Sequence, residues 1–166
     1  MRLNKIELKD FIYLSNEEVM MVLDWRNNEN IRKWMYDSDC IPKKNHLKFI
    51  ESLKKNEMKK YFLVLREEKY IGVIYFINID DGNSTEFGLY SNPDIKIPGI
   101  GRVLEKICIE YAFDILKVKK LKLEVFEDNK QVINLHRKFN FKEVSTMVMN
   151  NKKVLCMELK NEDRQF

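Results

Sequence analysis

The chain has 166 residues, 45% hydrophobic and 34% charged, which is enough apolar sequence for one domain with its own core. This composition excludes a disordered tail and a mini-protein that depends on disulfides. The net charge is +4, but the lysines occur as scattered pairs with acids between them, so we expect no nucleic-acid surface.

The cysteines and histidines offer little material for a metal site. Cys40, Cys108 and Cys156 form no Cys-x-x-Cys pair, and with His46 and His136 they show no recognisable ligand spacing. No stretch approaches the roughly 20 apolar residues that span a bilayer, and the first residues lack the apolar segment of a secretory signal. We therefore expect no metal, no membrane and a cytoplasmic location.

The first 55 residues predict a strand followed by two helices. Residues 3–11 alternate apolar and charged side chains, as a strand with one buried face does. Ser15 stands three residues before Glu18, the spacing of a capping box, and the apolar residues that follow predict a helix ending near residues 27–28. A second helix is predicted over residues 42–55. Its apolar residues share one face: Leu47, Ile50 and Leu53.

Three short strands come next, separated by turns rich in charged residues. They are predicted at residues 60–66, 70–79 and 84–90. Because the turns are only a few residues long, we expect the strands to pair antiparallel as a meander. Prolines and glycines between residues 93 and 101 end this meander.

The second half of the chain begins with its most regular apolar pattern. Between residues 102 and 116 apolar pairs recur every four residues, which predicts a helix lying on a sheet through one broad buried stripe. The pairs are Val103/Leu104, Ile107/Cys108, Tyr111/Ala112 and Ile115/Leu116. A strand at 120–126, a helix at 129–139 and two strands around a turn at Asn150–Asn151 follow.

The resulting order of elements is β-α-α-β-β-β-α-β-α-β-β, without a linker or an internal repeat. This order predicts one α+β domain over residues 1–166, with a mixed central sheet of about seven strands flanked by about four helices.

The segment from Lys96 to Gly101 joins a predicted strand to the amphipathic helix. Its backbone N–H groups and the helix N-terminus can meet an anion, and Gly99 and Gly101 let a phosphate approach the backbone closely. A plain loop leading into a helix explains the same residues. A Walker loop and a dinucleotide-binding fold are excluded, because neither Gly-Lys-Ser/Thr nor a third glycine in register is present.

Two further motifs flank this segment. Glu86-Phe87-Gly88-Leu89-Tyr90 precedes it, and Asn129, Asn134-Leu135-His136 and Phe141 follow it. With the order of elements, they make nearly the whole chain resemble the GNAT superfamily of acyl-CoA N-acyltransferases. In that family a Gln/Arg-x-x-Gly-x-Gly/Ala loop holds the pyrophosphate of acetyl-CoA. Here Lys96 stands at the Gln/Arg position.

The resemblance implies acetyl-CoA as the acetyl donor and indicates where it binds. Residues 87–90 should separate from the strand at 121–126, so that pantetheine hydrogen-bonds to the freed edge and the wedge admits the thioester. The cofactor-binding residues implied are Phe87, Gly88, Leu89, Tyr90, Lys96, Gly99, Ile100, Gly101, Arg102, Val103, Asn129 and Asn134.

Amide formation from a thioester needs a base for the amine, a donor for the carbonyl oxygen and an acid for the thiolate. Glu86 is the candidate base, with Ser84 as a polar neighbour, although a plain strand charge also explains Glu86. The resemblance implies a main-chain N–H near Leu89 as the donor. His136 stands where the family usually has the Tyr that protonates the thiolate, and an imidazole is competent for this step. Packing, or a hydrogen bond to CoA, is the alternative for His136.

Three motifs narrow the resemblance within the superfamily: Trp25-Arg26-Asn27, His46-Leu47-x-Phe49-Ile50 and Tyr61-Phe62-Leu63-Val64. They are most similar to acetyltransferases of pseudaminic acid biosynthesis, which serve flagellin glycosylation. Such enzymes acetylate the 4-amino group of a UDP-linked 4-amino-4,6-dideoxy sugar. The implied partner is therefore a nucleotide-linked amino sugar.

On this resemblance Arg26 and His46 would contact the nucleotide sugar, while Trp25 and Trp34 would stack on its base. The plain alternatives are that Trp25 belongs to the core and that Arg26 pairs with a nearby acid, Asp24 or Glu29.

Two other functions stay open. One is N-terminal acetylation of a ribosomal protein, because the Trp-Arg-Asn element occurs in those enzymes too. The other is a binding module that keeps the acyl-CoA pocket without turnover, which the histidine at position 136 allows. The sequence also leaves the oligomeric state open, with a homodimer as one option.

Overall fold

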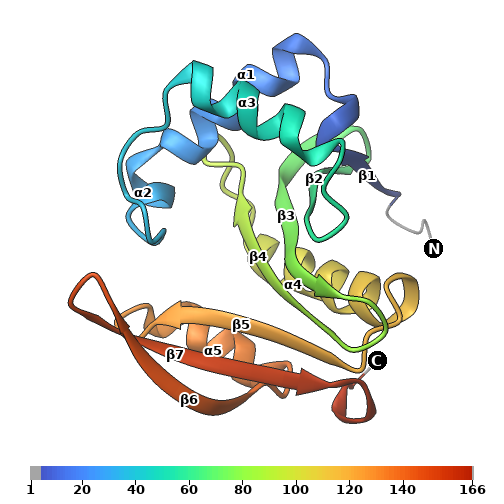
Figure 1. Ribbon diagram of the computed structural model, residues 1–166, viewed down its shortest axis with the longest axis vertical. Coiled ribbons are helices and arrows are strands. Elements are labelled where there is room, and N and C mark those ends of the chain that lie inside the picture. Colours follow the sequence, from blue (N-terminus) through green and yellow to red (C-terminus); the bar gives the residue numbers. More distant parts are fainter. Residues whose placement is uncertain (1–4, 166) are drawn as a thin grey trace.

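Seven strands form one mixed sheet at the centre of the structure, a computed structural model that describes residues 5–165 (Figure 1). Their order across the sheet is β1-β2-β3-β4-β5-β7-β6. Neighbouring strands run antiparallel, except that β4 and β5 are parallel. The strands are β1 (Ile6–Asp10), β2 (Lys60–Arg66), β3 (Lys69–Asp80), β4 (Ser84–Ser91), β5 (Lys120–Phe126), β6 (Lys142–Met149) and β7 (Lys152–Lys160).

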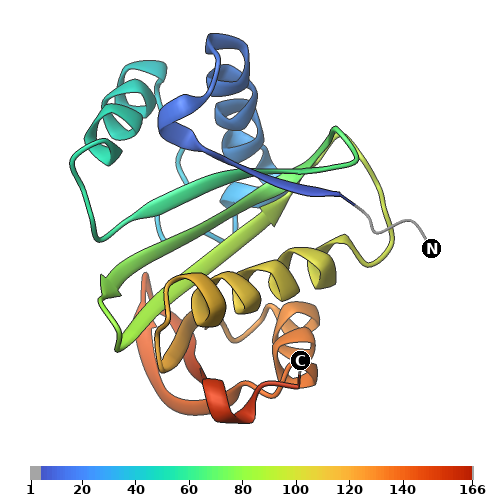
Figure 2. The same cartoon turned by 90° about the vertical axis from the view of Figure 1, so that its right-hand side faces the viewer.

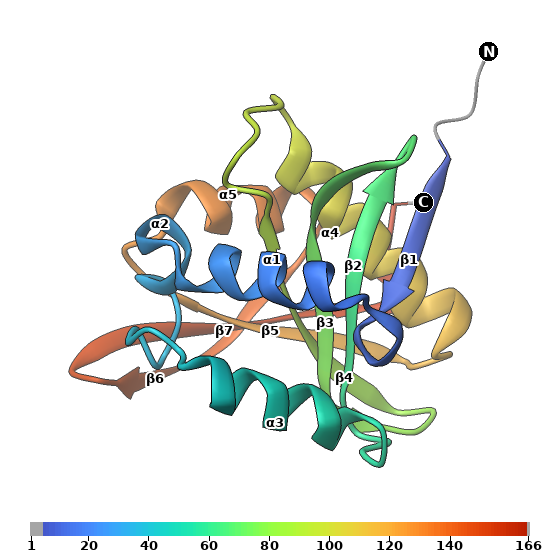
Figure 3. The ribbon, with the colours of Figure 1, turned by 90° about the horizontal axis from the view of Figure 1, so that it is seen from above.

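Helices cover both faces of the sheet (Figures 2 and 3). One face carries α1 (Asn16–Asn27), α2 (Glu29–Arg32) and α3 (Lys43–Leu53), and the other carries α4 (Ile100–Glu110) and α5 (Lys130–Lys138). The predicted mixed sheet of about seven strands and about four longer helices is confirmed. The one-turn helix α2 was not predicted. Of the strand predicted over residues 3–11, residues 3 and 4 lie outside the described part.

The strands near the centre of the sheet are buried on both faces, and alternate residues feed two different cores. On β2, Phe62 and Val64 pack toward α4, while Leu63 between them packs toward α1 and α3. This alternation follows from the two-residue period of a strand. It gives the sheet one core layer against α4 and a separate layer under α1 and α3.

The predicted capping box at the start of α1 is confirmed, and it is part of a larger polar cluster. Glu18 is 6% exposed, and its carboxylate accepts hydrogen bonds from Lys9 Nζ at 2.6 Å, the Ser15 N–H at 2.9 Å and the Tyr70 hydroxyl at 3.0 Å. Burial alone would raise the pKa of Glu18, but these hydrogen bonds outweigh it and lower the pKa to about 2. The cluster joins β1, α1 and β3.

The predicted buried face of α3 is wrong by one residue. Leu47 is 45% exposed, and His46 takes the buried place beside Ile50 and Leu53. The physical reason is a polar contact with α1, in which His46 Nε2 lies 2.9 Å from the Val19 carbonyl oxygen.

The predicted stripe on the helix over 102–116 is also shifted. The most buried side chains lie one residue later, at Leu104, Glu105, Cys108 and Ile109, and Ile115 is 63% exposed. A four-residue repeat advances about 40° more than one α-helical turn at each step, so its last pair rotates away from the sheet. The chain also changes from α-helix to a π-helical turn over Tyr111–Ile115.

Candidate active site

Strands β4 and β5 are paired over only part of their length. Their ladder joins Ser84 to Lys120, Thr85 to Leu121 and Glu86 to Lys122, and no rung follows within the described chain. From residues 87 and 123 onward the strands diverge into a wedge, visible in Figure 1 as the gap between the upper and lower parts of the sheet. The predicted separation of these strands is confirmed.

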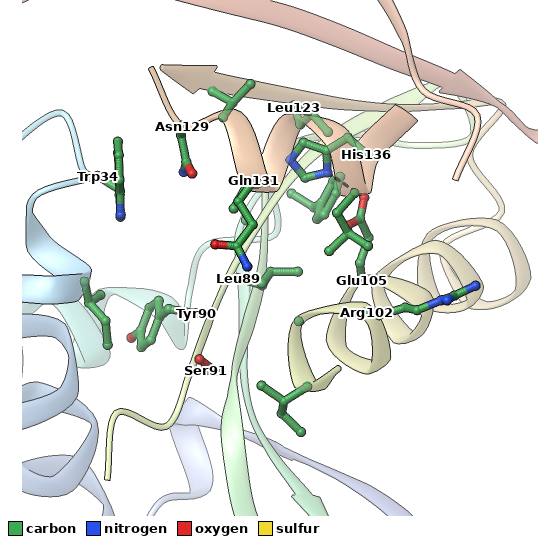
Figure 4. Close-up of a pocket in the computed structure, with 18 of the residues that line it drawn as sticks. Trp34, Leu89, Tyr90, Ser91, Arg102, Glu105, Leu123, Asn129, Gln131 and His136 are labelled. Atoms are coloured by element: carbon green, nitrogen blue, oxygen red, sulfur yellow. Dashed lines mark hydrogen bonds and ion pairs between the residues drawn. The ribbon is translucent and has the colours of Figure 1, made fainter. Parts of the chain in front are cut away.

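A cavity of about 910 Å³ occupies this wedge (Figure 4). Its walls come from β4, β5, the start of α4, one side of α5 and the segment around α2. Most residues predicted to bind the cofactor line it: Phe87, Gly88, Leu89, Tyr90, Gly99, Ile100, Gly101, Arg102, Asn129 and Asn134. Lys96 and Val103 do not line it, and Lys96 borders a separate depression with Tyr70.

The N-terminus of α4 opens into the cavity. Gly99 occupies the N-cap position with φ +79°, a left-handed conformation that suits glycine, and no side chain caps the helix. The Ile100 N–H donates to the Ile97 carbonyl oxygen at 3.2 Å, so the N–H groups of Gly101 and Arg102 are the ones left for another acceptor. A Cβ at Gly101 would lie 3.8 Å from Leu135 Cδ2, an ordinary contact, so packing within the protein does not require glycine there.

Gly88 has a different role, because it makes room for an aromatic stack. A Cβ at Gly88 would overlap the Tyr75 ring, which stacks on Tyr61 with 4.8 Å between centroids. Tyr75 and Tyr90 line the cavity. Burial raises the pKa of both hydroxyl groups, and the positive charge of Arg26 acts against this shift.

His136 is buried at the cavity wall and paired with a carboxylate that the sequence analysis missed. Its Nδ1 lies 2.6 Å from Oε1 of Glu105, whose side chain is fully buried. Figure 4 shows the other ring nitrogen on the side of the ring that faces the cavity. The signal for Glu105 was present in the sequence, because a charged residue stands in the middle of the most apolar helix face of the chain.

Glu86 lies at the apex of the wedge, on the last rung of the β4–β5 ladder, although it does not line the cavity itself. Burial, and next the negative charge of Glu124, raise the pKa of Glu86 above its usual value. Glu124 does line the cavity, and it accepts a hydrogen bond from the Tyr36 hydroxyl at 2.6 Å. Ser84 begins β4, two residues before Glu86, and lies outside the cavity.

Of the four residues predicted to contact the nucleotide sugar, three lie outside the cavity lining: Trp25, Arg26 and His46. Trp25 is 2% exposed in the core under α1, and His46 is held by the Val19 carbonyl. Arg26 donates to the Asp37 carbonyl oxygen at 3.0 Å, instead of pairing with Asp24 or Glu29. Amphipathic packing of α1 and α3 turns Trp25 and His46 inward.

Trp34, the fourth of these residues, lines the cavity, and it is 37% exposed. In Figure 4 it stands on the side of α2, across the cavity from Gln131 and His136. Over residues 5–165, no three His, Cys, Asp or Glu side chains are grouped so that they could hold a metal ion. No helix in the same range is long and apolar enough to cross a membrane.

Comparisons with known proteins place this chain in a family of acetyltransferases. The profile of the acetyltransferase (GNAT) family matches residues 20–141. Two proteins named acetyltransferase PseH, from two strains of Campylobacter jejuni, are 41% and 43% identical over 136 residues, covering 82% of this chain and 84% of each relative.

Solved structures show the same fold. The crystal structure of Campylobacter jejuni N-acetyltransferase PseH in complex with acetyl coenzyme A matches with a TM-score of 0.77 and 35% identity, covering 95% of this chain and 99% of that one. A spermidine N-acetyltransferase from Vibrio cholerae, in complex with CoA and spermine, has a TM-score of 0.85 at 20% identity, covering 95% and 96%. At that identity the second likeness concerns the fold alone.

Proposed function

Since the chain belongs to the acetyltransferase (GNAT) family, we propose that it transfers the acetyl group of acetyl-CoA to the 4-amino group of a nucleotide-linked amino sugar. The sugar is of the UDP-4-amino-4,6-dideoxy-N-acetyl-altrosamine type, an intermediate of pseudaminic acid biosynthesis. The observation that carries this proposal is the 41–43% identity to acetyltransferases PseH over 82% of the chain. The wedge supplies the geometry for the reaction.

The start of α4 is the binding site for the pyrophosphate of acetyl-CoA. Its free N–H groups and the helix dipole suit an anion, and the absence of a side chain at Gly99 and Gly101 keeps the approach open. The unpaired edge of β4 beyond Glu86 offers backbone groups to the pantetheine amides, which would lie in the wedge as a short extra strand. Asn129 and Asn134 border the same cavity from the side of α5.

Three groups around the wedge supply the chemistry of acyl transfer. Glu86 takes the amine proton through water, and its raised pKa brings the carboxylate nearer to the basicity this task needs. The Leu89 N–H donates to the thioester carbonyl oxygen. His136 Nε2 gives a proton to the departing thiolate, and the amine attacks directly while both substrates are bound.

The acceptor enters from the side of α2. Trp34 offers an aromatic face to a base, and Glu124 offers a negative charge to the sugar ammonium before it loses its proton. Arg26 stands behind this wall, where its charge acts on Tyr75 and Tyr90.

The experiment is an acceptor panel with purified protein and acetyl-CoA. The panel contains the UDP-4-amino-4,6-dideoxy sugar, UDP-N-acetylglucosamine as a control without a free amine, a ribosomal N-terminal peptide, and spermidine. We expect release of free CoA thiol and a singly acetylated product in the mass spectrum only with the amino sugar. A higher rate with the peptide or with spermidine would replace the proposed acceptor, and saturable acetyl-CoA binding without any product would indicate a binding module.

A further inference from the structure

The Glu105–His136 pair is an unusual feature for the apolar layer in which it lies. Glu105 is fully buried on α4 and His136 is 6% exposed on α5, with 2.6 Å between Oε1 and Nδ1. The neighbours of Glu105 along the buried face are Leu104, Cys108 and Ile109. A buried carboxylate is costly unless its charge is paired, so an apolar residue would suit the packing of α4 better.

The two nitrogens of the imidazole have different surroundings: Nδ1 contacts Glu105, and Nε2 lies on the cavity side. Because Nδ1 is occupied by Glu105, it carries a proton whenever that carboxylate is ionised. The ring is held against Phe87 and Phe141, with centroid distances of 6.2 and 5.8 Å. Nε2 is left on the cavity side, with no hydrogen bond to another described residue.

Aromatic side chains make the other described contacts of this ring. From β4 it meets Phe87, and from the segment after α5 it meets Phe141, neither of which titrates. Tyr111, whose hydroxyl has its pKa raised by burial, also titrates in this layer, and so does Cys108, one turn beyond Glu105 on α4. Burial, followed by the charge of Glu105, raises the pKa of its thiol well above the usual value, so it stays neutral. Of the groups that the structure places in contact with the ring, the Glu105 carboxylate is therefore the charged one.

We infer that Glu105 is a positioning residue for acetyl transfer: it holds Nδ1–H of His136 and thereby keeps a protonated Nε2 directed into the wedge. The inference rests on the proposed function, in which Nε2 protonates the CoA thiolate. In that step the Nε2–H bond breaks and an S–H bond forms, which leaves neutral imidazole with its remaining proton on Nδ1. Water returns the proton to Nε2 before the next turnover.

A first test needs no acceptor, so it is independent of the proposed function. The chain contains only two histidines, and His46, bound to the Val19 carbonyl, is a built-in control. Nitrogen-15 spectra of both rings are recorded across pH for the wild type and for Glu105→Gln, which keeps the side-chain volume and removes the charge. We expect the His136 signals and their pH dependence to change while those of His46 stay the same. Unchanged His136 signals would overturn the inference.

A second test separates positioning from a structural role. We expect Glu105→Gln to lower kcat about tenfold or more and to move the alkaline limb of kcat to lower pH, with KM for acetyl-CoA changed less than twofold. Glu110→Gln, at an exposed position of the same helix, is the control and should match the wild type. Thermal unfolding checks that both variants are folded.

The same substitution is then made in a His136→Phe background. Positioning predicts less than a twofold further loss in kcat there, because the group that Glu105 orients is gone. Equal losses in both backgrounds would overturn the inference, as would a Glu105→Gln enzyme with wild-type kcat and pH profile. If no acceptor is acetylated but the ring signals respond to Glu105→Gln, the proposed function fails and the pairing of Glu105 with His136 stands.

Discussion

Three partly or fully buried carboxylates in this chain differ chiefly in their partners, and the partner decides what each can do. Glu18 is surrounded by donors from three elements, which hold it ionised. Burial, and next the charge of the Glu124 carboxylate, raise the pKa of Glu86 and so favour its protonated form. Glu105 meets an imidazole that can exchange a proton. The first arrangement serves stability, and the other two suit proton transfer.

Glu18 should make folding sensitive to acid. Its pKa in the folded chain is about 2, below the ordinary 4.5, so its contribution to stability is fully present above about pH 4.5 and is lost as the pH falls toward 2. We expect Glu18→Gln to lower the free energy of unfolding at pH 7 by about 2 kcal/mol and to flatten its dependence on pH in that window. Urea unfolding between pH 2 and 7 measures both effects.

The exposed neighbour Glu17 provides the control, since Glu17→Gln keeps α1 and its capping box. If Glu17→Gln and Glu18→Gln changed stability and its pH dependence alike, the hydrogen bonds to Glu18 would not be the cause.

His136 should act on the chemical step. We expect His136→Phe to lower kcat on the order of 10²-fold with little change in acetyl-CoA affinity, because it removes a proton donor without touching the start of α4. His136→Tyr should recover part of the rate and move the alkaline limb of kcat to higher pH, because a phenol stays protonated there. Steady-state rates across pH and calorimetric binding of acetyl-CoA measure these effects.

Removing His136 leaves the Glu105 carboxylate without its partner, so a second variant is needed. His136→Asn keeps an N–H for that carboxylate but has no dissociable proton to give. If both variants retain wild-type kcat and its pH profile, water protonates the thiolate and His136 serves packing or binding.

At the scale of elements, local patterns predicted where helices and strands occur, but their buried faces depended on partners elsewhere in the chain. Caps, turns and periodicity are local, so the capping box at Ser15 and the turn at Asn150–Asn151 could be found from sequence. The place of His46 depends on a carbonyl of α1, and that of Glu105 on a ring 31 residues away. Neither partner is visible in the periodicity of α3 or α4.

In the candidate site, too, some features follow from local sequence and others depend on packing between elements. The glycine segment and the residues of β4 line the cavity as predicted, because the binding proposed for them uses the backbone, and backbone geometry follows from local sequence. The sequence did not show that Trp25, Arg26 and His46 lie outside the cavity lining, because a helix pattern does not tell a side chain that faces a core from one that faces a cavity.

The N-terminus of α4 should bind the donor through its backbone. We expect Gly101→Val to weaken acetyl-CoA binding about tenfold or more, about 1.4 kcal/mol, because branched methyl groups would obstruct the first turn. The fold should survive, since a Cβ at this position has room beside Leu135. Calorimetry and circular dichroism measure the two expectations.

The control for this variant is Glu110→Val, which places the same β-branched side chain at an exposed position of the same helix, away from the cavity. Unchanged affinity in Gly101→Val would mean that the pyrophosphate binds elsewhere.

For the whole molecule, our proposal gives the wedge a donor side and an acceptor side, and Tyr36 joins the segment after α2 to β5 across it. Tyr36, which follows α2, donates to Glu124 of β5 and packs edge-on against Phe126 at 5.6 Å. Asn150, in the turn between β6 and β7, donates to the Tyr36 carbonyl oxygen at 2.6 Å. The proposed acceptor side is therefore built jointly by the segment after α2 and by β5, while α4 and α5 form the proposed donor side.

This division predicts that the two substrates can be affected separately. We expect Glu124→Gln to raise KM for the amino sugar about tenfold, because it removes a negative charge that faces the incoming ammonium, with less than a twofold change in acetyl-CoA affinity. Tyr36→Phe should cause a smaller increase in that KM, since Glu124 keeps its charge but loses the hydrogen bond that orients it.

Gly101→Val should show the opposite pattern, with weaker acetyl-CoA binding and an unchanged KM for the amino sugar. Steady-state kinetics with each substrate varied in turn distinguishes these patterns. Equal effects of Glu124→Gln on both substrates would mean that the acceptor does not enter beside β5.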